Sequence, residues 1–152
     1  MATEKKKPDV TVAVIGAGFS GLGMAKKLQD AGIEDFVILE AAGEVGGTWR
    51  DSKYPGAAVD VPNHLDSYSL AQNPDWTRMF SNSDEIQRYI VDIADRFDLR
   101  RKIRFNTKIV EAHFDEVSNL WEAKAQDGTL FRARFVVGAM GPFAESRIPD
   151  VP

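Results

Sequence analysis

The stretch Val10-Thr11-Val12-Ala13-Val14-Ile15-Gly16-Ala17-Gly18-Phe19-Ser20-Gly21 decides the fold. Its first half is an apolar run that ends at a glycine, which is typical of a buried parallel strand over 10–15. Gly16, Gly18 and Gly21 then form the pattern G-x-G-x-x-G, and a helical spacing of apolar residues begins behind them. This order of strand, glycine turn and helix is the context in which the pattern predicts a dinucleotide-binding site.

Each glycine has its own physical role. Gly16 allows a tight turn, Gly18 lets a pyrophosphate approach the backbone, and Gly21 lets the helix pack closely on the strand. The N-terminus of that helix offers free N–H groups and the positive end of its dipole to the phosphates.

A second apolar run, 36–39, supports this interpretation because it ends in Glu40. A carboxylate about 20 residues after the glycine motif is placed to bind a ribose hydroxyl. The alternative is an ordinary glycine turn followed by a solvated glutamate. The order of the elements favours a dinucleotide that contains adenosine ribose, and it leaves open whether that dinucleotide is NAD or FAD.

Composition narrows the class of protein. The chain has 152 residues, of which 43% are hydrophobic and 28% charged, which suits one globular domain rather than a disordered chain. The net charge of −4 does not suggest a nucleic-acid partner. No apolar run approaches the length of a membrane span, and the lack of cysteine excludes disulfides and fits a reducing cytoplasm. His64 and His113 lack the spacing of metal ligands, so we expect no metal site.

The periodicity along the chain predicts the other elements. We expect a disordered tail over 1–9 and a folded domain over 10–152, with a helix over 18–31 and a strand over 36–40. About thirty irregular residues follow, 41–70, and their aromatic content argues against disorder. A packing helix with Ser83 as its N-cap comes next, and its basic residues are expected to be solvated, namely Arg96, Arg100, Arg101 and Lys102.

The last third of the chain predicts strands. Residues 103–105 indicate a third parallel strand, and three alternating segments predict an antiparallel meander over 107–114, 120–125 and 130–135. A second buried strand is expected over 135–142. We therefore predict an α/β fold, a Rossmann-like parallel sheet with helices and an inserted three-stranded antiparallel β-meander. This is the arrangement of an incomplete FAD domain from a two-dinucleotide-fold flavoprotein, so the topology favours FAD.

Three further motifs carry a family resemblance. They are Gly43-Glu44-Val45-Gly46-Gly47-Thr48-Trp49, then Tyr54-Pro55-Gly56-Ala57-Ala58-Val59-Asp60-Val61-Pro62, and finally Gly138-Ala139-Met140-Gly141-Pro142 followed by 148–152. Together with the first glycine motif, they resemble the N-terminal FAD-binding portion of a Baeyer–Villiger monooxygenase, a class B flavoprotein monooxygenase. The resemblance covers essentially the whole chain after the tail.

The resemblance implies a set of FAD-binding residues: Gly16, Ala17, Gly18, Phe19, Ser20, Gly21, Glu40, Ala41, Gly46, Gly47, Thr48, Trp49, Asp60, Val61, Ile109, Met140 and Gly141. Within this set, Glu40 would bind the adenosine ribose and Ile109 would contact adenine through its backbone. Asp60 would be the catalytic residue, near the isoalloxazine ring and paired with an active-site arginine.

Some positions keep a second interpretation. Asp60 is also suited to cap its loop through nearby N–H groups, and Trp49 and Tyr54 are suited to pack under the loop instead of contacting flavin. The chain departs from the family at Asp66, where an aromatic residue is usual, and at Met140, which replaces a threonine. The sequence contains no second glycine motif for NADPH, so we expect no NADPH domain and no complete reaction cycle from the chain alone.

The expected function is that of an FAD-binding domain or fragment of an NADPH-dependent flavoprotein monooxygenase that inserts oxygen into ketones. The alternatives are a stand-alone FAD-binding module and the product of a broken gene that binds nothing. An NAD-only dehydrogenase is disfavoured, because no catalytic His, Tyr-Lys or Cys arrangement is visible. A homo-oligomer formed through an exposed sheet edge is a further expectation.

Overall fold

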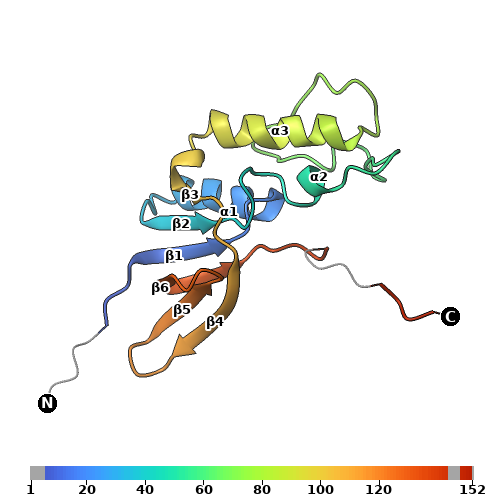
Figure 1. Cartoon of the computed structure of the whole chain (residues 1–152). Coiled ribbons are helices and arrows are strands. Elements are labelled where there is room, and N and C mark those ends of the chain that lie inside the picture. Colours follow the sequence, from blue (N-terminus) through green and yellow to red (C-terminus); the bar gives the residue numbers. More distant parts are fainter. Residues whose placement is uncertain (1–5, 144–147, 152) are drawn as a thin grey trace, which may run out of the picture.

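One six-stranded mixed sheet organises the chain (Figure 1), with strand order β3-β2-β1-β6-β5-β4. The computed structural model describes residues 6–143 and 148–151. The α/β fold is confirmed, with parallel Rossmann-like strands and an antiparallel meander in one sheet. Its elements are β1 Val10–Ile15, α1 Phe19–Asp30, β2 Phe36–Leu39, α2 Thr48–Asp51, α3 Ser83–Arg96, the 3₁₀ turn η1 Arg100–Lys102, β3 Ile103–Arg104, β4 Ile109–Asp115, β5 Leu120–Ala125 and β6 Leu130–Gly138.

β1 lies at the centre of the sheet and is buried on both faces. It runs parallel to β2 on one side and to β6 on the other. Val12 and Val14 pack in the main core with residues of α1 and α3, whereas Ala13 belongs to a smaller cluster on the opposite face, with Ile109 of β4 against it. Burial on both faces explains why the sequence of β1 is almost continuously apolar. Figure 1 shows α3 running above α1, and the meander extending away from both.

β6 joins two segments that the sequence predicts as separate strands. The third meander strand and the following central strand were expected as separate segments, but they form the single strand β6. Ala133 is the pivot, because it pairs with Trp121 of β5 on one side and with Val10 of β1 on the other.

Beyond Ala133 only β1 remains as a partner. The expected burial of this segment is therefore wrong for Phe135, which is 60% exposed. Val136 and Val137 are half-buried against the core, and Ala139 is buried.

The start of α3 corrects a predicted helix cap. Asn82, not Ser83, is the N-cap, since it has extended backbone angles and its side chain accepts a hydrogen bond from the Glu85 N–H at 3.0 Å. Ser83 is already helical and buried. Asn and Ser serve equally well as caps, so the residue type alone could not separate two adjacent candidates.

The long loop between β2 and α3 is ordered by a buried side chain. Asn63 is completely buried, and its amide donates to Arg78 O at 2.7 Å and to Ser81 Oγ at 2.6 Å. Its carbonyl accepts from the Ser81 N–H at 2.9 Å. A bridge between Ala58 and Asn82 closes the same segment. The loop is therefore held as a compact unit without regular secondary structure, as its composition predicts.

The expected N-terminal tail makes contacts where the structure describes it. Lys6 Nζ pairs with Glu122 at 2.8 Å and with Asp115 at 3.2 Å. The Asp9 carboxylate accepts from the Arg132 N–H at 2.7 Å, so the chain lies against the meander before β1 begins. Residues 1–5 of the tail lie outside the described residues, as do 144–147 and Pro152 near the last motif.

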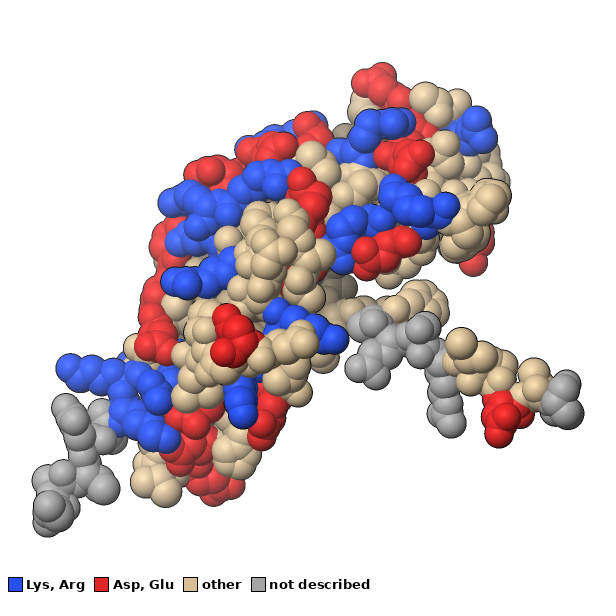
Figure 2. Space-filling model, in the orientation of Figure 1, with Lys and Arg blue, Asp and Glu red and all other residues tan. Residues whose placement is uncertain are grey.

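Charges are mixed over the surface. Figure 2 shows Lys, Arg, Asp and Glu interspersed over most of the face in view. Within residues 6–143 and 148–151, no helix is both long enough and apolar enough to cross a bilayer. The same residues contain no group of three or more side chains placed to hold a metal ion.

Replacing Asn63 tests the role of the buried amide in ordering the loop. Asn63→Ala removes three side-chain hydrogen bonds and leaves buried partners unsatisfied, so we expect a loss of about 3 kcal/mol in the free energy of unfolding. Urea denaturation measures it. Asn73→Ala, which removes one exposed hydrogen bond, is the matched control and is expected to cost less than about 1 kcal/mol. Equal effects of the two variants would contradict this account of the loop.

Candidate dinucleotide-binding site

The glycine turn after β1 is shaped by close backbone packing. Gly16 has a φ of 104°, a conformation that only glycine adopts readily, and a Cβ at this position would lie 2.5 Å from Ala139 O. A Cβ on Gly21 would lie 1.9 Å from Gly16 O, so no other residue fits there. α1 therefore starts in direct contact with the turn that precedes it.

The N-terminus of α1 is open to an anion. Gly18 is its N-cap, and no side chain caps the helix. The first N–H groups of a helix lack partners within the helix, and here Gly18 has no side-chain oxygen to accept from them. These groups, together with the helix dipole, are suited to bind a diphosphate. Phe19, Ser20 and Gly21 supply the first turn.

A second glycine turn lies against the first. The Gly46 N–H donates to Ala17 O at 3.0 Å. A Cβ on Gly47 would lie 3.4 Å from the Gly18 Cα, in van der Waals contact, so the two backbones lie close together. Gly46 and Gly47 both have positive φ, at 128° and 54°. The structure therefore brings together the two glycine segments that the sequence separates by about 25 residues.

Glu40 is buried where these segments meet. The residue is 4% exposed. Its Oε2 accepts from the Ala17 N–H at 2.7 Å, and its Oε1 accepts from the Ala42 N–H at 2.9 Å and from Arg50 Nη1 at 3.0 Å. The predicted ribose carboxylate is thus also a structural clamp between the glycine turn and the loop after β2. Ala41, which lies in the sequence between Glu40 and its partner Ala42, is exposed.

The segment after β6 reaches the same turn. The Ala139 N–H donates to Ile15 O at 2.8 Å, and the Met140 Cα would lie 3.5 Å from a Cβ on Gly16. Met140 itself is 61% exposed, and Gly141 has a φ of 74°. Met140 therefore lies beside the glycine turn.

Trp49 lies in α2 and Tyr54 follows it, and the sequence assigns each of them two alternative roles. It places Thr48 and Trp49 directly after Gly47. Trp49 is half-buried and packs against the main core, which is one of its two expected roles. Tyr54 is 64% exposed, so it does not pack under the loop.

Asp60 and Val61 are exposed. Within the described residues, Asp60 has no ion-pair partner and no side-chain hydrogen bond, so the alternative role as a loop cap is not seen. The pKa of the nearby Asp66 carboxyl is raised, mainly by the partial burial of Asp66 itself and further by the negative charge of Asp60.

Ile109 lies on the opposite face of the sheet from α1. It packs against Ala13, Val37 and Leu39, at an irregular point in the pairing of β4 with β5. The chain just before it returns to the site, because the Thr107 N–H donates to Glu40 O at 2.7 Å.

Several side chains at the site were not found from sequence. Gln87 of α3 donates through Nε2 to Val45 O at 2.8 Å, while its Oε1 is buried without a partner and would lie 1.9 Å from a Cβ on Gly46. The Tyr68 hydroxyl donates to Phe19 O, and burial raises the pKa of Tyr68. No local pattern predicts these contacts, since each joins residues about 40 or more positions apart.

Two glycine substitutions test the packing of the turn. Gly21→Ala places its Cβ 1.9 Å from Gly16 O, so we expect a loss of at least about 3 kcal/mol in unfolding free energy, measured in urea. Gly43→Ala is the control, because its Cβ meets only Asn106 Oδ1 at 3.5 Å and its φ is not positive. The control is expected to be neutral or to stabilise by up to about 1 kcal/mol. A tolerated Gly21→Ala would refute the described packing.

Comparisons with known proteins agree with this geometry. A family of NAD(P)-binding Rossmann-like domains matches residues 14–83. A Baeyer–Villiger monooxygenase of Streptomyces coelicolor is 48% identical over 98% of this chain and 28% of its own length. One from Pseudomonas aeruginosa is 43% identical over 91% of this chain and 26% of its own length.

Solved structures show the same relationship. The cyclohexanone monooxygenase of Rhodococcus sp. Phi1 bound to NADP⁺ has a TM-score of 0.88 and 37% identity, over 96% of this chain and 28% of that one. The OTEMO complex with FAD and NADP has a TM-score of 0.87 and 34% identity, over 96% of this chain and 28% of that one. The chain thus spans less than a third of the length of these relatives. In both sequence and fold, it is homologous to the N-terminal FAD/NAD(P)-binding portion of Baeyer–Villiger monooxygenases.

Proposed function

We propose that the chain binds FAD. The observation that carries this proposal is the convergence of three elements: the uncapped N-terminus of α1, the Gly46–Gly47 turn against it, and the buried Glu40 carboxylate beside both. The first two suit a diphosphate and the third suits a ribose. The OTEMO structure, part of which matches 96% of this chain, was solved with FAD and NADP.

The residues present fit a dinucleotide. The first turn of α1 has no side-chain cap, and both glycine turns present backbone without side chains, which suits a backbone-lined diphosphate. Ala17, Gly18, Phe19 and Ser20 would hold the diphosphate, with Glu40 on the ribose. Trp49, Met140 and Gly141 would lie towards the flavin, and Ile109 towards adenine. When bound, FAD would supply redox and oxygen chemistry, and the protein would bind and orient it.

For the whole protein, we propose an NADPH-dependent monooxygenase that inserts one oxygen atom beside a ketone carbonyl. The support is the homology to the Baeyer–Villiger monooxygenases and to a cyclohexanone 1,2-monooxygenase of Acinetobacter sp., which is 33% identical over 96% of this chain. In the whole protein proposed here, the exposed carboxylate of Asp60 would pair with a cationic side chain from outside the described residues. A cytoplasmic location, expected from the absence of cysteine, stays a prediction.

A stand-alone FAD-binding module is the second candidate. The observation that favours it is that the site is held together by hydrogen bonds within the chain itself. The Ala17 N–H donates to the Glu40 carboxylate, and the Gly46 N–H donates to Ala17 O. FAD retained by the purified chain through gel filtration would favour the module. Loss of FAD from a folded chain would favour a site that is completed by other parts of a longer protein.

Replacing Glu40 tests the binding proposal. We expect the chain to retain about one FAD after desalting, seen in its absorbance spectrum, and Glu40→Ala to weaken FAD binding by tenfold or more, since it removes a charged acceptor. Isothermal titration measures the affinity. Glu111→Ala, on an exposed part of β4, is the control and is expected to leave the affinity unchanged.

A colourless wild-type chain would contradict FAD binding by the chain itself. Equal affinities of wild type and Glu40→Ala, with both folded by circular dichroism, would remove Glu40 from the site.

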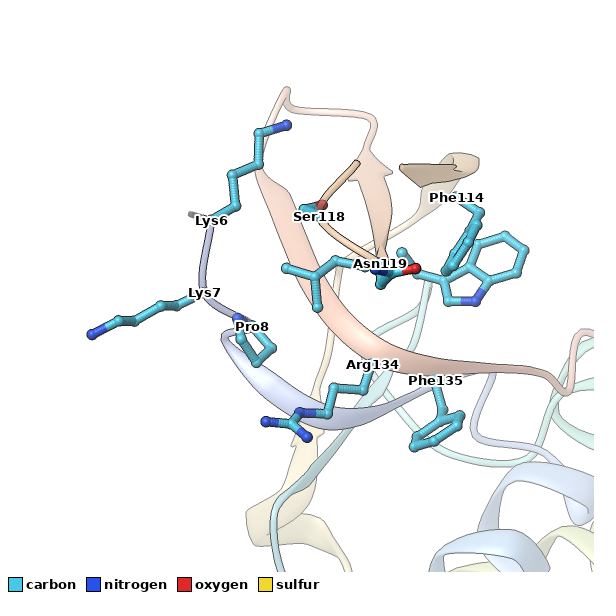
Figure 3. A pocket seen from close by; sticks show the side chains of 10 residues that line it. Lys6, Lys7, Pro8, Phe114, Ser118, Asn119, Arg134 and Phe135 are labelled. Atoms are coloured by element: carbon cyan, nitrogen blue, oxygen red, sulfur yellow. The ribbon is translucent and has the colours of Figure 1, made fainter. Parts of the chain in front are cut away.

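We also propose that the chain self-associates through β6. Beyond Ala133 the outer edge of β6 has no described strand partner, and unpaired edges recruit other strands. Figure 3 shows Phe114 and Phe135 beside this edge, with Lys6, Lys7 and Arg134 at the rim. They line a hollow of about 710 Å³ that lies away from the glycine turns.

Phe135→Lys tests this association. A charge at this exposed position should shift the chain towards monomer, as measured by sedimentation velocity over a range of concentrations. Met79→Lys is the control, since Met79 is similarly exposed, at 63%, but lies in the loop before α3. A wild-type chain that stays monomeric at all concentrations would overturn this proposal.

A further inference from the structure

Arg50 is a charged residue whose donors are almost completely used within the site. Its Nη1 donates to Glu40 Oε1 at 3.0 Å and to Glu44 O at 2.6 Å. Its Nε and Nη2 donate to the two carboxylate oxygens of Asp51, each at 2.8 Å. A guanidinium carries five N–H donors, so four are engaged. The side chain is 21% exposed, and it is therefore held in one orientation on α2.

The two oxygens of Glu40 are unequally occupied. Oε1 accepts from Arg50 and from the Ala42 N–H, whereas Oε2 accepts only from the Ala17 N–H. A carboxylate offers about four acceptor positions, two on each oxygen. The remaining position is on Oε2, the oxygen that contacts the glycine turn. Arg50 and the Ala42 N–H thus saturate one oxygen, and the acceptor position left free is on the oxygen beside the glycine turn.

We propose that Arg50 is a positioning residue that orients Glu40 for a ribose 2′-hydroxyl; this inference rests on the proposed binding of FAD. Without Arg50, the carboxylate would keep two backbone donors but lose the side chain that fixes Oε1. The Glu40 carboxylate could then rotate, and Oε2 would no longer be held in one position to accept a hydrogen bond. Arg50 acts through Glu40 and does not itself contact the nucleotide.

The same contacts predict which ribose is accepted. An arginine near this position accommodates a 2′-phosphate in proteins that bind NADP. Here the planar fork of Arg50, the part that matches phosphate oxygens, is occupied by Asp51. The free acceptor position on Glu40 would repel a phosphate dianion and would accept a hydrogen bond from a hydroxyl group. The site therefore selects a nucleotide with an unmodified 2′-hydroxyl.

Competition between nucleotides tests the inference. ADP and 2′-deoxy-ADP are titrated against the FAD-loaded chain, and the ratio of their affinities reports the ribose contact. In the wild type we expect ADP to bind about tenfold more tightly than 2′-deoxy-ADP. In Arg50→Gln we expect this ratio to fall to about twofold or less, and FAD affinity to fall about tenfold. Arg50→Lys, which keeps the charge but not the fork, should restore only part of the ratio.

Arg100→Gln is the matched control. Arg100 of η1 pairs with Asp95 and, through Nη1, with Glu44 Oε1 at 2.8 Å on the loop after β2. This variant therefore removes arginine–carboxylate pairs without touching Glu40. We expect it to leave the nucleotide ratio at its wild-type value. The combined variant Glu40→Gln/Arg50→Gln should show the same ratio as Glu40→Gln alone, because Arg50 acts only through Glu40.

The outcomes separate the two proposals. If wild type binds FAD and Arg50→Gln weakens ADP and 2′-deoxy-ADP by the same factor, Arg50 only stabilises the loop, and the inference fails while FAD binding stands. If wild type binds neither FAD nor ADP, the proposed function fails and takes the inference with it. Urea denaturation of each variant shows that the chain is folded when affinities are compared.

Discussion

The hydrogen bonds of Glu40 are the interaction on which the site depends. Its backbone N–H donates to Arg104 O and its carbonyl accepts from the Thr107 N–H, so it extends β2 and ties it to the chain beyond β3. Its carboxylate holds the Ala17 N–H of the glycine turn and the guanidinium of Arg50. A buried carboxylate is stable only when its oxygens are satisfied. One residue therefore aligns the glycine turn, the following loop and α2, and the same oxygens define where a ribose could bind.

The loop between β2 and α3 is part of the fold, although it has little regular structure. α3 holds it through Gln87 and through the Tyr89 hydroxyl, which donates to Ala71 O at 2.8 Å. Asn63 closes it internally, and Tyr68 ties it to Phe19 at the start of α1. These side chains replace the backbone ladder that a helix or strand would supply. Because the loop carries the second glycine turn, its order positions half of the candidate site.

Elements that are specified by neighbouring residues can be predicted from the sequence. A choice between two chemically equivalent neighbours, such as the two candidate caps of α3, cannot. β1, α1 and β2 follow from an apolar run, a glycine motif and a second apolar run, each readable within a few residues. Asn82 and Ser83 are chemically equal candidates for the cap of α3, and only the backbone angles distinguish them. The sequence predicts the two halves of β6 as separate strands, because a strand that changes partners midway does not keep one alternation of buried and exposed residues. The pairing of Ala133 on both sides is a tertiary fact.

The sequence by itself determined the glycine turn, the acid after β2, the meander and the family resemblance, because backbone conformation and hydrophobic period are properties of neighbouring residues. Only the tertiary structure decided that the two glycine turns touch, that Gln87 lies against Gly46, and that Arg50 saturates one oxygen of Glu40. It also left Asp60 exposed, without a side-chain hydrogen bond or an ion pair within the described residues. The physical reason is that these contacts depend on how the loop folds back over α1 under the packing of α3. Such packing arises from many weak contacts between distant residues and leaves no periodic trace in the chain.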